Sequence, residues 1–149
     1  MRFPRFALVS LILAVPAFAA SPLQEKVRAW RVAHERELID EYREFLAIPN
    51  ITVDRANIRR NADYLVAGMK RRGIDARLLT IPSPNLNPVV FGEVRVPGAT
   101  RTLMLYAHYD GQPLDPKEWA TPPFTPTLLN RKLEDGGQAI PLPDRKSTV

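Results

Sequence analysis

Apolar residues recur with helical spacing between Pro22 and Leu46. The central stripe is formed by three residues at i, i+4 and i+7: Leu38, Tyr42 and Phe45. Glutamate and arginine fill the other face, and Pro49 ends the pattern because it cannot continue a helix. The pattern predicts one long amphipathic helix over Pro22–Leu46, with His34 on its solvated surface.

A second helix is predicted from Asp54, whose carboxylate suits an N-cap, to about Arg72. Its buried stripe is expected to consist of Ile58, Ala62, Leu65, Val66 and Met69. Gly73 follows at the position after a helix that favours a left-handed backbone. The helix is therefore expected to end there in a glycine cap.

The period then changes to that of strands, which are predicted over Ala76–Ile81, Val89–Val96 and Thr102–Ala107. The last of these, TLMLYA, is an almost continuous apolar run, as is typical of a strand buried on both faces of a sheet. Helices followed by strands in this order predict an α/β fold, with layers built on a mixed sheet.

Regular periodicity ends after Asp110. Gly111–Pro126 is a proline-punctuated loop in which Trp119 and Phe124 are expected to act as apolar anchors. Residues 134–149 are polar and are expected to form an irregular tail. A stretch of nearly forty residues with little structure of its own is unusual inside a compact domain, so we expect the chain to stop in mid-domain, after a portion spanning residues 20–133.

The first residues have the pattern of a signal peptide, predicted over residues 1–19. Arg2 and Arg5 precede an apolar stretch, and Ala17-Phe18-Ala19 is a small-x-small cleavage site. We therefore expect export, to a periplasm or out of the cell, with cleavage after Ala19. An uncleaved anchor is less consistent with the sequence, because polar residues begin at Ser21, short of the roughly 20 apolar residues of a membrane span.

Composition narrows the chemistry that the 149 residues can perform. The absence of cysteine excludes disulfides, thiol catalysis and cysteine-ligated metals, and the two histidines limit any imidazole chemistry to His34 and His108. The formal net charge is +5, without a basic stripe carrying interleaved aromatic residues. A nucleic-acid partner is therefore not expected.

The candidate chemistry lies at the end of the third predicted strand, where His108 is followed two residues later by Asp110. In an extended backbone these side chains project to the same side. One imidazole nitrogen could then bind a metal while Asp110 accepts a hydrogen bond from the other. The spacing equally allows a purely structural pair, with a histidine at a strand end bonded to a nearby carboxylate.

The surrounding segment, TLMLYAHYDGQPLDPKEWATPPFTPTL, resembles the first metal-ligand segment of the zinc-dependent metallopeptidase and amidohydrolase family of carboxypeptidase G, aminoacylase, carnosinase-type dipeptidases and succinyl-diaminopimelate desuccinylase. The resemblance extends over roughly Leu23–Leu133. It implies that His108 is a metal ligand, the first for zinc, and that Asp110 is a catalytic-site carboxylate that orients its ring. It further implies the N-terminal part of a layered zinc-peptidase catalytic domain.

The family site holds two zinc ions, and its other parts come later in the chain: a bridging Asp, a Glu base beside a metal-binding Glu, a further acidic ligand and a late His. Neither Asp135 nor Asp144 has the Asp-Asp-Lys context expected around the bridging residue. We therefore expect an incomplete site, without the lid domain that serves dimerisation in the family.

Two functions remain open at this point. The first is an exported zinc peptidase acting on dipeptides or small amides, represented by an N-terminal fragment that is inactive alone. The second is a truncated, non-catalytic exported domain with at most a binding role.

Overall fold

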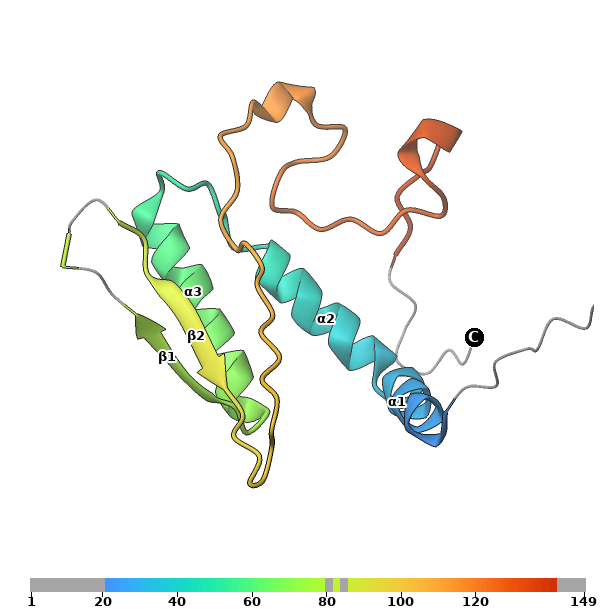
Figure 1. The fold of residues 1–149 in the computed structure, drawn as a ribbon. Helices are drawn as coiled ribbons and strands as arrows, with labels where there is room; N and C mark the ends of the chain where they lie inside the picture. The colour runs from blue at the N-terminus through green and yellow to red at the C-terminus, as the bar shows by residue number, and fades with distance from the viewer. Residues whose placement is uncertain (1–20, 80–81, 84–85, 142–149) are drawn as a thin grey trace, which may run out of the picture. The chain divides into compact units, whose positions relative to one another are not determined.

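The computed structural model describes residues 21–79, 82–83 and 86–141, and the predicted signal peptide and cleavage site lie outside this part. Figure 1 shows three helices, α1 (Pro22–Ala33), α2 (Glu35–Leu46) and α3 (Arg55–Arg71), and two strands, β1 (Asp75–Leu79) and β2 (Val89–Glu93). The chain divides into two compact units between residues 35 and 36. The α/β class predicted from the sequence is confirmed.

The first unit contains α1, which begins with a capping box. The Ser21 side chain accepts a hydrogen bond from the Gln24 backbone, and the Gln24 side chain accepts one from the Ser21 N–H. The helix ends at His34, whose φ of −114° and ψ of 11° leave helical geometry. The single helix predicted over Pro22–Leu46 is therefore wrong.

The His34 side chain gives a local reason for the break. Its Nδ1 lies 2.8 Å from the Trp30 carbonyl oxygen, and its ring stacks on Trp30 with centroids 4.3 Å apart. The imidazole thus occupies the end of α1 as a cap, and the helical pattern resumes at Glu35.

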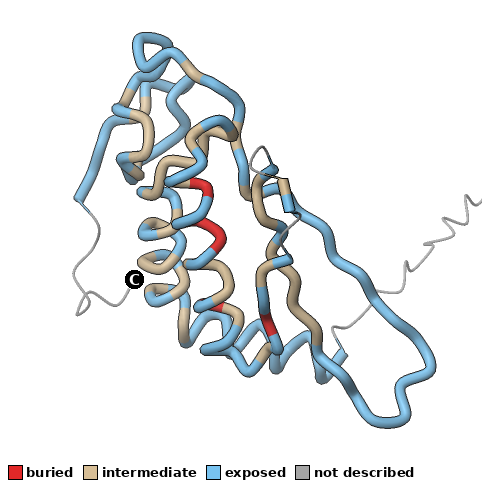
Figure 2. Tube along the Cα trace, turned by 90° about the vertical axis from the view of Figure 1, so that its left-hand side faces the viewer, coloured by how far each residue is buried: buried red, intermediate tan, exposed pale blue. Residues whose placement is uncertain are grey.

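In the second unit, α3 and the β1–β2 hairpin form the packed centre. The strands are antiparallel, with Asp75 opposite Glu93 and Leu79 opposite Val89. The helix packs against both strands. Figure 2 places the buried positions on α3 and on the strand beside it. The fully buried apolar residues of the described chain are Ile58, Ala62 and Ala76.

Both ends of α3 were predictable. Asp54 is its N-cap and accepts a hydrogen bond of 3.2 Å from the Asn57 backbone N–H. Gly73 follows the C-cap with a φ of +75°, the left-handed conformation expected of it. Two of the five residues predicted for its buried stripe, Ile58 and Ala62, are fully buried, and the other three are half-buried.

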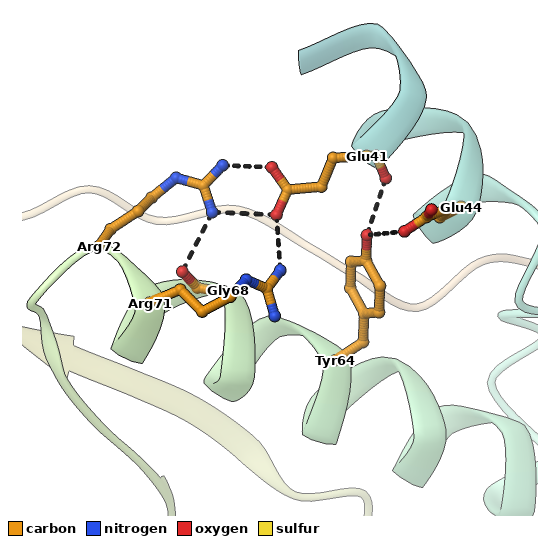
Figure 3. Close-up of polar contacts among 6 residues, drawn as sticks. All are labelled: Glu41, Glu44, Tyr64, Gly68, Arg71 and Arg72. Atoms are coloured by element: carbon orange, nitrogen blue, oxygen red, sulfur yellow. Dashed lines mark hydrogen bonds and ion pairs between the residues drawn. The ribbon is translucent and has the colours of Figure 1, made fainter. Parts of the chain in front are cut away.

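The α2 helix contacts α3 through a polar cluster that Figure 3 shows in detail. Arg72 binds both carboxylate oxygens of Glu41, and Arg71 Nη2 lies 2.8 Å from Glu41 Oε1. Hydrogen bonding by Arg72, with a further contribution from Arg71, lowers the pKa of Glu41 to about 2, against the opposing effect of its partial burial. The Tyr64 hydroxyl donates to the Glu41 backbone carbonyl at 2.9 Å.

The strand predicted over Thr102–Ala107 is not formed, which corrects the sequence analysis. Its apolar side chains lie in solvent, since Leu103, Met104, Leu105 and Tyr106 are 81–87% exposed. The two strands of the described residues pair with each other, so the sheet present there is antiparallel and does not include this segment. An apolar run forms a buried strand only where neighbours pair with it and cover it.

The irregular course predicted after Asp110 is confirmed for the described residues. Two short 3₁₀ turns, Pro116–Glu118 and Leu133–Asp135, interrupt it, and a single bridge joins Leu129 to Ala139. Residues 142–149, including Asp144, lie outside the described part. Within residues 21–79, 82–83 and 86–141, no helix combines the length and apolar character of a membrane span.

Candidate functional site

His108 and Asp110 lie in an extended segment outside any strand. Their side chains meet as the spacing predicts, with His108 Nδ1 at 3.3 Å from Asp110 Oδ1. The imidazole is largely in solvent, with 72% of its side chain exposed, whereas the Asp110 side chain is 38% exposed. The two predicted site residues are therefore in contact. Their roles, as a metal ligand and as the carboxylate that orients it, stay predictions.

Three segments that are distant in sequence meet at this pair: the turn after α2, the segment of the pair itself, and the stretch that contains Pro88. The Gly111 N–H donates to the Asn50 carbonyl at 2.7 Å, and the Thr52 N–H donates to the Gly111 carbonyl at 2.9 Å. These bonds make a parallel bridge between Ile51 and Gly111. The third segment joins through Tyr109, whose hydroxyl donates to the Pro88 carbonyl.

Gly111 lies close to the Asn50 side chain at this crossing. A Cβ at this position would lie 2.9 Å from Asn50 Oδ1 and 3.2 Å from Asn50 Cγ. The Asn50 side chain is directed by its Nδ2, which donates to the Tyr109 carbonyl at 3.4 Å. A side chain at position 111 would therefore displace the Asn50 side chain from this crossing.

Both carboxylate oxygens of Asp110 have partners. Oδ2 accepts a hydrogen bond of 3.0 Å from the Thr52 hydroxyl, and Oδ1 faces His108. Partial burial works to raise the pKa of Asp110, but the hydrogen bonds from Thr52 and His108 outweigh it and lower that pKa below its usual value. Asp110 is thus an ionised acceptor at neutral pH.

The ionised carboxylate determines where the imidazole proton lies. A carboxylate only accepts hydrogen bonds, so His108 Nδ1 carries the hydrogen when the ring is neutral. The lone pair is then on Nε2, which lies 3.3 Å from the Tyr106 hydroxyl. The Tyr106 and His108 rings meet edge to face, with centroids 5.3 Å apart. Nε2 is the atom that would face a metal.

This arrangement fits one ligand of a metal centre, since ligating histidines characteristically donate their other ring nitrogen to a carboxylate or carbonyl. Catalytic zinc sites use three protein ligands. The described residues contain no group of three or more histidine, cysteine, aspartate or glutamate side chains that could hold an ion. Within the described residues, His108 is therefore not part of a group of three such ligands.

A cavity of about 370 Å³ lies beside the site and shares Asn50 with it. The end of α2 and the loop after Asp110 form its walls, and Trp119 and Phe124 line it. Phe124 is half-buried with an unusual φ of 59°, whereas Trp119 is 53% exposed. Both predicted anchors thus face the same cavity, and Phe124 is the more enclosed.

Three residues that support the pair were not predicted from the sequence: Asn50, Thr52 and Asn87. Asn87 Nδ2 donates to the Thr52 carbonyl at 2.9 Å and lies 3.4 Å from Thr52 Oγ1. Their polar side chains near turns were visible in the sequence, but no spacing connects Thr52 to a residue 58 positions away.

Comparison with known proteins gives two relatives of one kind. The chain is similar to a Cys-Gly metallodipeptidase of Schizosaccharomyces pombe, with 27% identity over 106 residues, and to one of Candida albicans, with 32% identity over 103 residues. The aligned regions are 64% and 60% of this chain but 22% and 21% of those proteins. The chain thus spans about a fifth of the length of the curated relatives it matches.

No family model and no solved structure matches the chain. Both relatives are metallodipeptidases, which supports the resemblance at the level of a metallopeptidase family. They do not distinguish among the individual members of the family whose motif the sequence resembles.

Proposed function

We propose that this chain is the N-terminal part of the catalytic domain of an exported, zinc-dependent dipeptidase. In this proposal His108 is a metal ligand and Asp110 holds its ring. The observation that carries it is the 3.3 Å contact between His108 Nδ1 and Asp110 Oδ1, which puts the lone pair on Nε2, beside the Tyr106 hydroxyl. The similarity to two metallodipeptidases supports the same reading.

The residues of this chain would orient a metal ligand. Asp110, ionised and held by Thr52, keeps the His108 hydrogen on Nδ1 and so makes Nε2 the better donor. When zinc is bound in such a site, it polarises the scissile carbonyl and lowers the pKa of a bound water. The remaining ligands for the two ions and the general base would come from elsewhere in the complete enzyme.

Dipeptides or small amides are the proposed substrates. The support is the printed activity of the two relatives, which are named for the dipeptide Cys-Gly. Their similarity to this chain covers about a fifth of their length, so the substrate class is carried by the family resemblance and not by a pocket of this chain.

A second candidate is a truncated, non-catalytic exported domain with at most a binding role. The residues described here bring no three metal-ligating side chains together, which is compatible with this alternative as well as with the dipeptidase proposal. Under this alternative the His108–Asp110 pair is purely structural.

The first of two experiments separates these candidates, and the second tests the inactivity of the isolated chain that both of them expect. The first reads the coding DNA beyond codon 149, where the dipeptidase proposal expects an Asp-Asp-Lys and a Glu-Glu in some frame. The second incubates the purified chain, and its H108A variant, with zinc and a panel of dipeptides and measures released amino acids. The proposal predicts downstream motifs and no hydrolysis by either isolated chain. Absence of those motifs in every frame would favour the non-catalytic domain.

A further inference from the structure

The Asp110 carboxylate depends on a hydrogen-bond chain that begins outside the His-x-Asp motif. With 38% of its side chain exposed, Asp110 is not confined by packing. Its orientation instead rests on directed contacts at each oxygen: the Thr52 hydroxyl at 3.0 Å on Oδ2 and His108 Nδ1 at 3.3 Å on Oδ1.

The direction of each hydrogen bond follows from the groups involved. The Asn87 amide nitrogen can only donate, so Thr52 Oγ1 accepts from it across 3.4 Å. A hydroxyl has a single hydrogen, and this leaves the Thr52 hydrogen for Asp110 Oδ2. The same Asn87 nitrogen donates to the Thr52 carbonyl at 2.9 Å, which fixes the backbone as well.

We propose that Thr52, held by Asn87, is a positioning residue that sets the Asp110 carboxylate and, through it, the ring orientation and tautomer of His108. The chain of contacts runs from Asn87 to Thr52, to Asp110 and to His108 Nδ1, and it ends at Nε2. Its importance for metal binding rests on the function proposed above. Its effect on the tautomer does not.

The segments that carry these residues make the contact specific. Thr52 lies in the turn that follows the Ile51–Gly111 bridge, and its N–H donates to the Gly111 carbonyl, which places its backbone against the residue next to Asp110. The β-branched side chain of threonine is stiff about χ1, which restricts where its hydroxyl can lie. A hydroxyl at this position therefore meets Asp110 without a large loss of side-chain freedom.

The test compares Thr52→Val, which keeps the shape but removes the donor, with Thr52→Ser, which keeps the donor. Thr127→Val is the matched control, because the Thr127 hydroxyl donates to the Thr125 carbonyl and is not part of the hydrogen-bond chain from Asn87 to His108. The readout is the ¹⁵N chemical shifts of the His108 ring in the metal-free chain. They are recorded at a pH well above the usual histidine pKa of about 6.5. A His34→Gln variant identifies which signals belong to His108.

We expect the Nδ1–H form of His108 in the unaltered chain, in T52S and in T127V. In T52V we expect the population of the Nε2–H form to rise and that of the Nδ1–H form to fall. Asp110→Asn is the positive control and should show the same change. Unchanged His108 shifts in a folded T52V would overturn the proposal. If T52V does not fold, Asn87→Ala takes its place. Loss of the Nδ1–H form in N87A, with T52S unaffected, supports the proposal. Retention of that form in N87A overturns the proposal.

A zinc titration of the same samples separates this inference from the proposed function. Loss of an outer hydrogen-bond partner of a ligating histidine typically weakens metal binding about 10- to 100-fold. A tautomer change in T52V with no zinc effect on His108 in any sample would support the role of Thr52 and contradict the metal site. A zinc effect on His108 without any tautomer change in T52V would support the metal site and contradict the role of Thr52.

Discussion

The hydroxyl of Thr52 donates a hydrogen bond of 3.0 Å to Oδ2 of Asp110, across 58 residues of sequence. This contact joins the turn after α2 to the segment that carries the candidate metal ligand. It also gives the carboxylate a partner on the side away from His108. The candidate site is therefore assembled by tertiary contacts between loops and not by a strand end.

Asn61 is expected to be important for the turn that leads to Thr52. It is fully buried on α3, and its Nδ2 donates to the Pro49 carbonyl at 2.7 Å and to the Asn57 carbonyl at 2.9 Å. Asn61→Ala leaves the Pro49 carbonyl without this donor, which should reduce the free energy of unfolding by about 1–3 kcal/mol. Urea denaturation measures this loss, with Asn130→Ala as the control, which removes an exposed hydrogen bond from the Gln138 N–H to Asn130 Oδ1. Equal stability of the two variants would contradict this role.

Glu41 should make stability depend on acid pH. Its pKa is lowered to about 2, mainly by hydrogen bonding to Arg72, from the usual 4.5. A carboxyl with a depressed folded-state pKa contributes its full stabilisation above the unfolded value and loses it as pH falls through the folded one. Because both arginines are well exposed, the contribution at neutral pH is on the order of 1 kcal/mol.

The measurement is the unfolding free energy of Glu41→Gln and of the unaltered chain between neutral pH and pH 2. The variant should be less stable at neutral pH, and the difference should shrink between about 4.5 and about 2. Glu37→Gln, an exposed position on the same helix, is the control and should show no such trend. A difference independent of pH would mean that the Glu41 charge does not stabilise the contact between α2 and α3.

Gly111→Ala is expected to loosen the crossing of the two loops. The added Cβ would lie 2.9 Å from Asn50 Oδ1, so the Asn50 side chain must move and its contact with Tyr109 is lost. Amide exchange at Thr52, whose N–H donates to the Gly111 carbonyl at 2.9 Å, should become faster. Adding Asn50→Ala removes the clashing atoms and should restore part of the protection. No recovery in the double variant would show that the clash is not the cause.

The exposed segment Thr102–Ala107 should exchange its amide hydrogens quickly. Its side chains are largely in solvent, and the described residues place it outside the β1–β2 sheet. Hydrogen exchange on the monomeric chain should give slow exchange in β1 and β2 and fast exchange over residues 102–107. Strong protection there, together with a cooperative melt, would show that the segment is a strand of a completed sheet.

Export is tested at the N-terminus. The Ala17-Phe18-Ala19 site predicts a processed protein that starts at Ala20. N-terminal sequencing of protein recovered from the exported fraction checks this. Intact Met1 on that protein would contradict cleavage.

Local signals predicted the local structure well. The α3 helix was defined by the Asp54 cap and by Gly73, and both strands of the hairpin lie within the strand-like segments predicted over residues 76–81 and 89–96, apart from Asp75 at the start of β1. The break at His34 was missed because it depends on how one imidazole contacts Trp30, which a hydrophobic period does not encode.

Long-range relationships were only partly accessible. The i, i+2 spacing predicted the contact of His108 with Asp110, since it follows from an extended backbone. The burial of Thr102–Ala107 was predicted wrongly, because an apolar run does not specify which segments cover it. The support from Thr52 and Asn87 was missed because it requires three loops to converge.

The most direct test of the central claim, that His108 is presented as a metal ligand, is a cobalt titration of the purified chain that follows both imidazoles by NMR. His108 Nε2 has the lone pair and its ring is 72% exposed, whereas His34 is capped against Trp30. We predict that paramagnetic broadening affects His108 before His34 and that Asp110→Asn weakens it. We also predict that dialysis removes the metal, because the described residues group no three ligands. Equal broadening of both histidines, or broadening of His34 first, would contradict the claim.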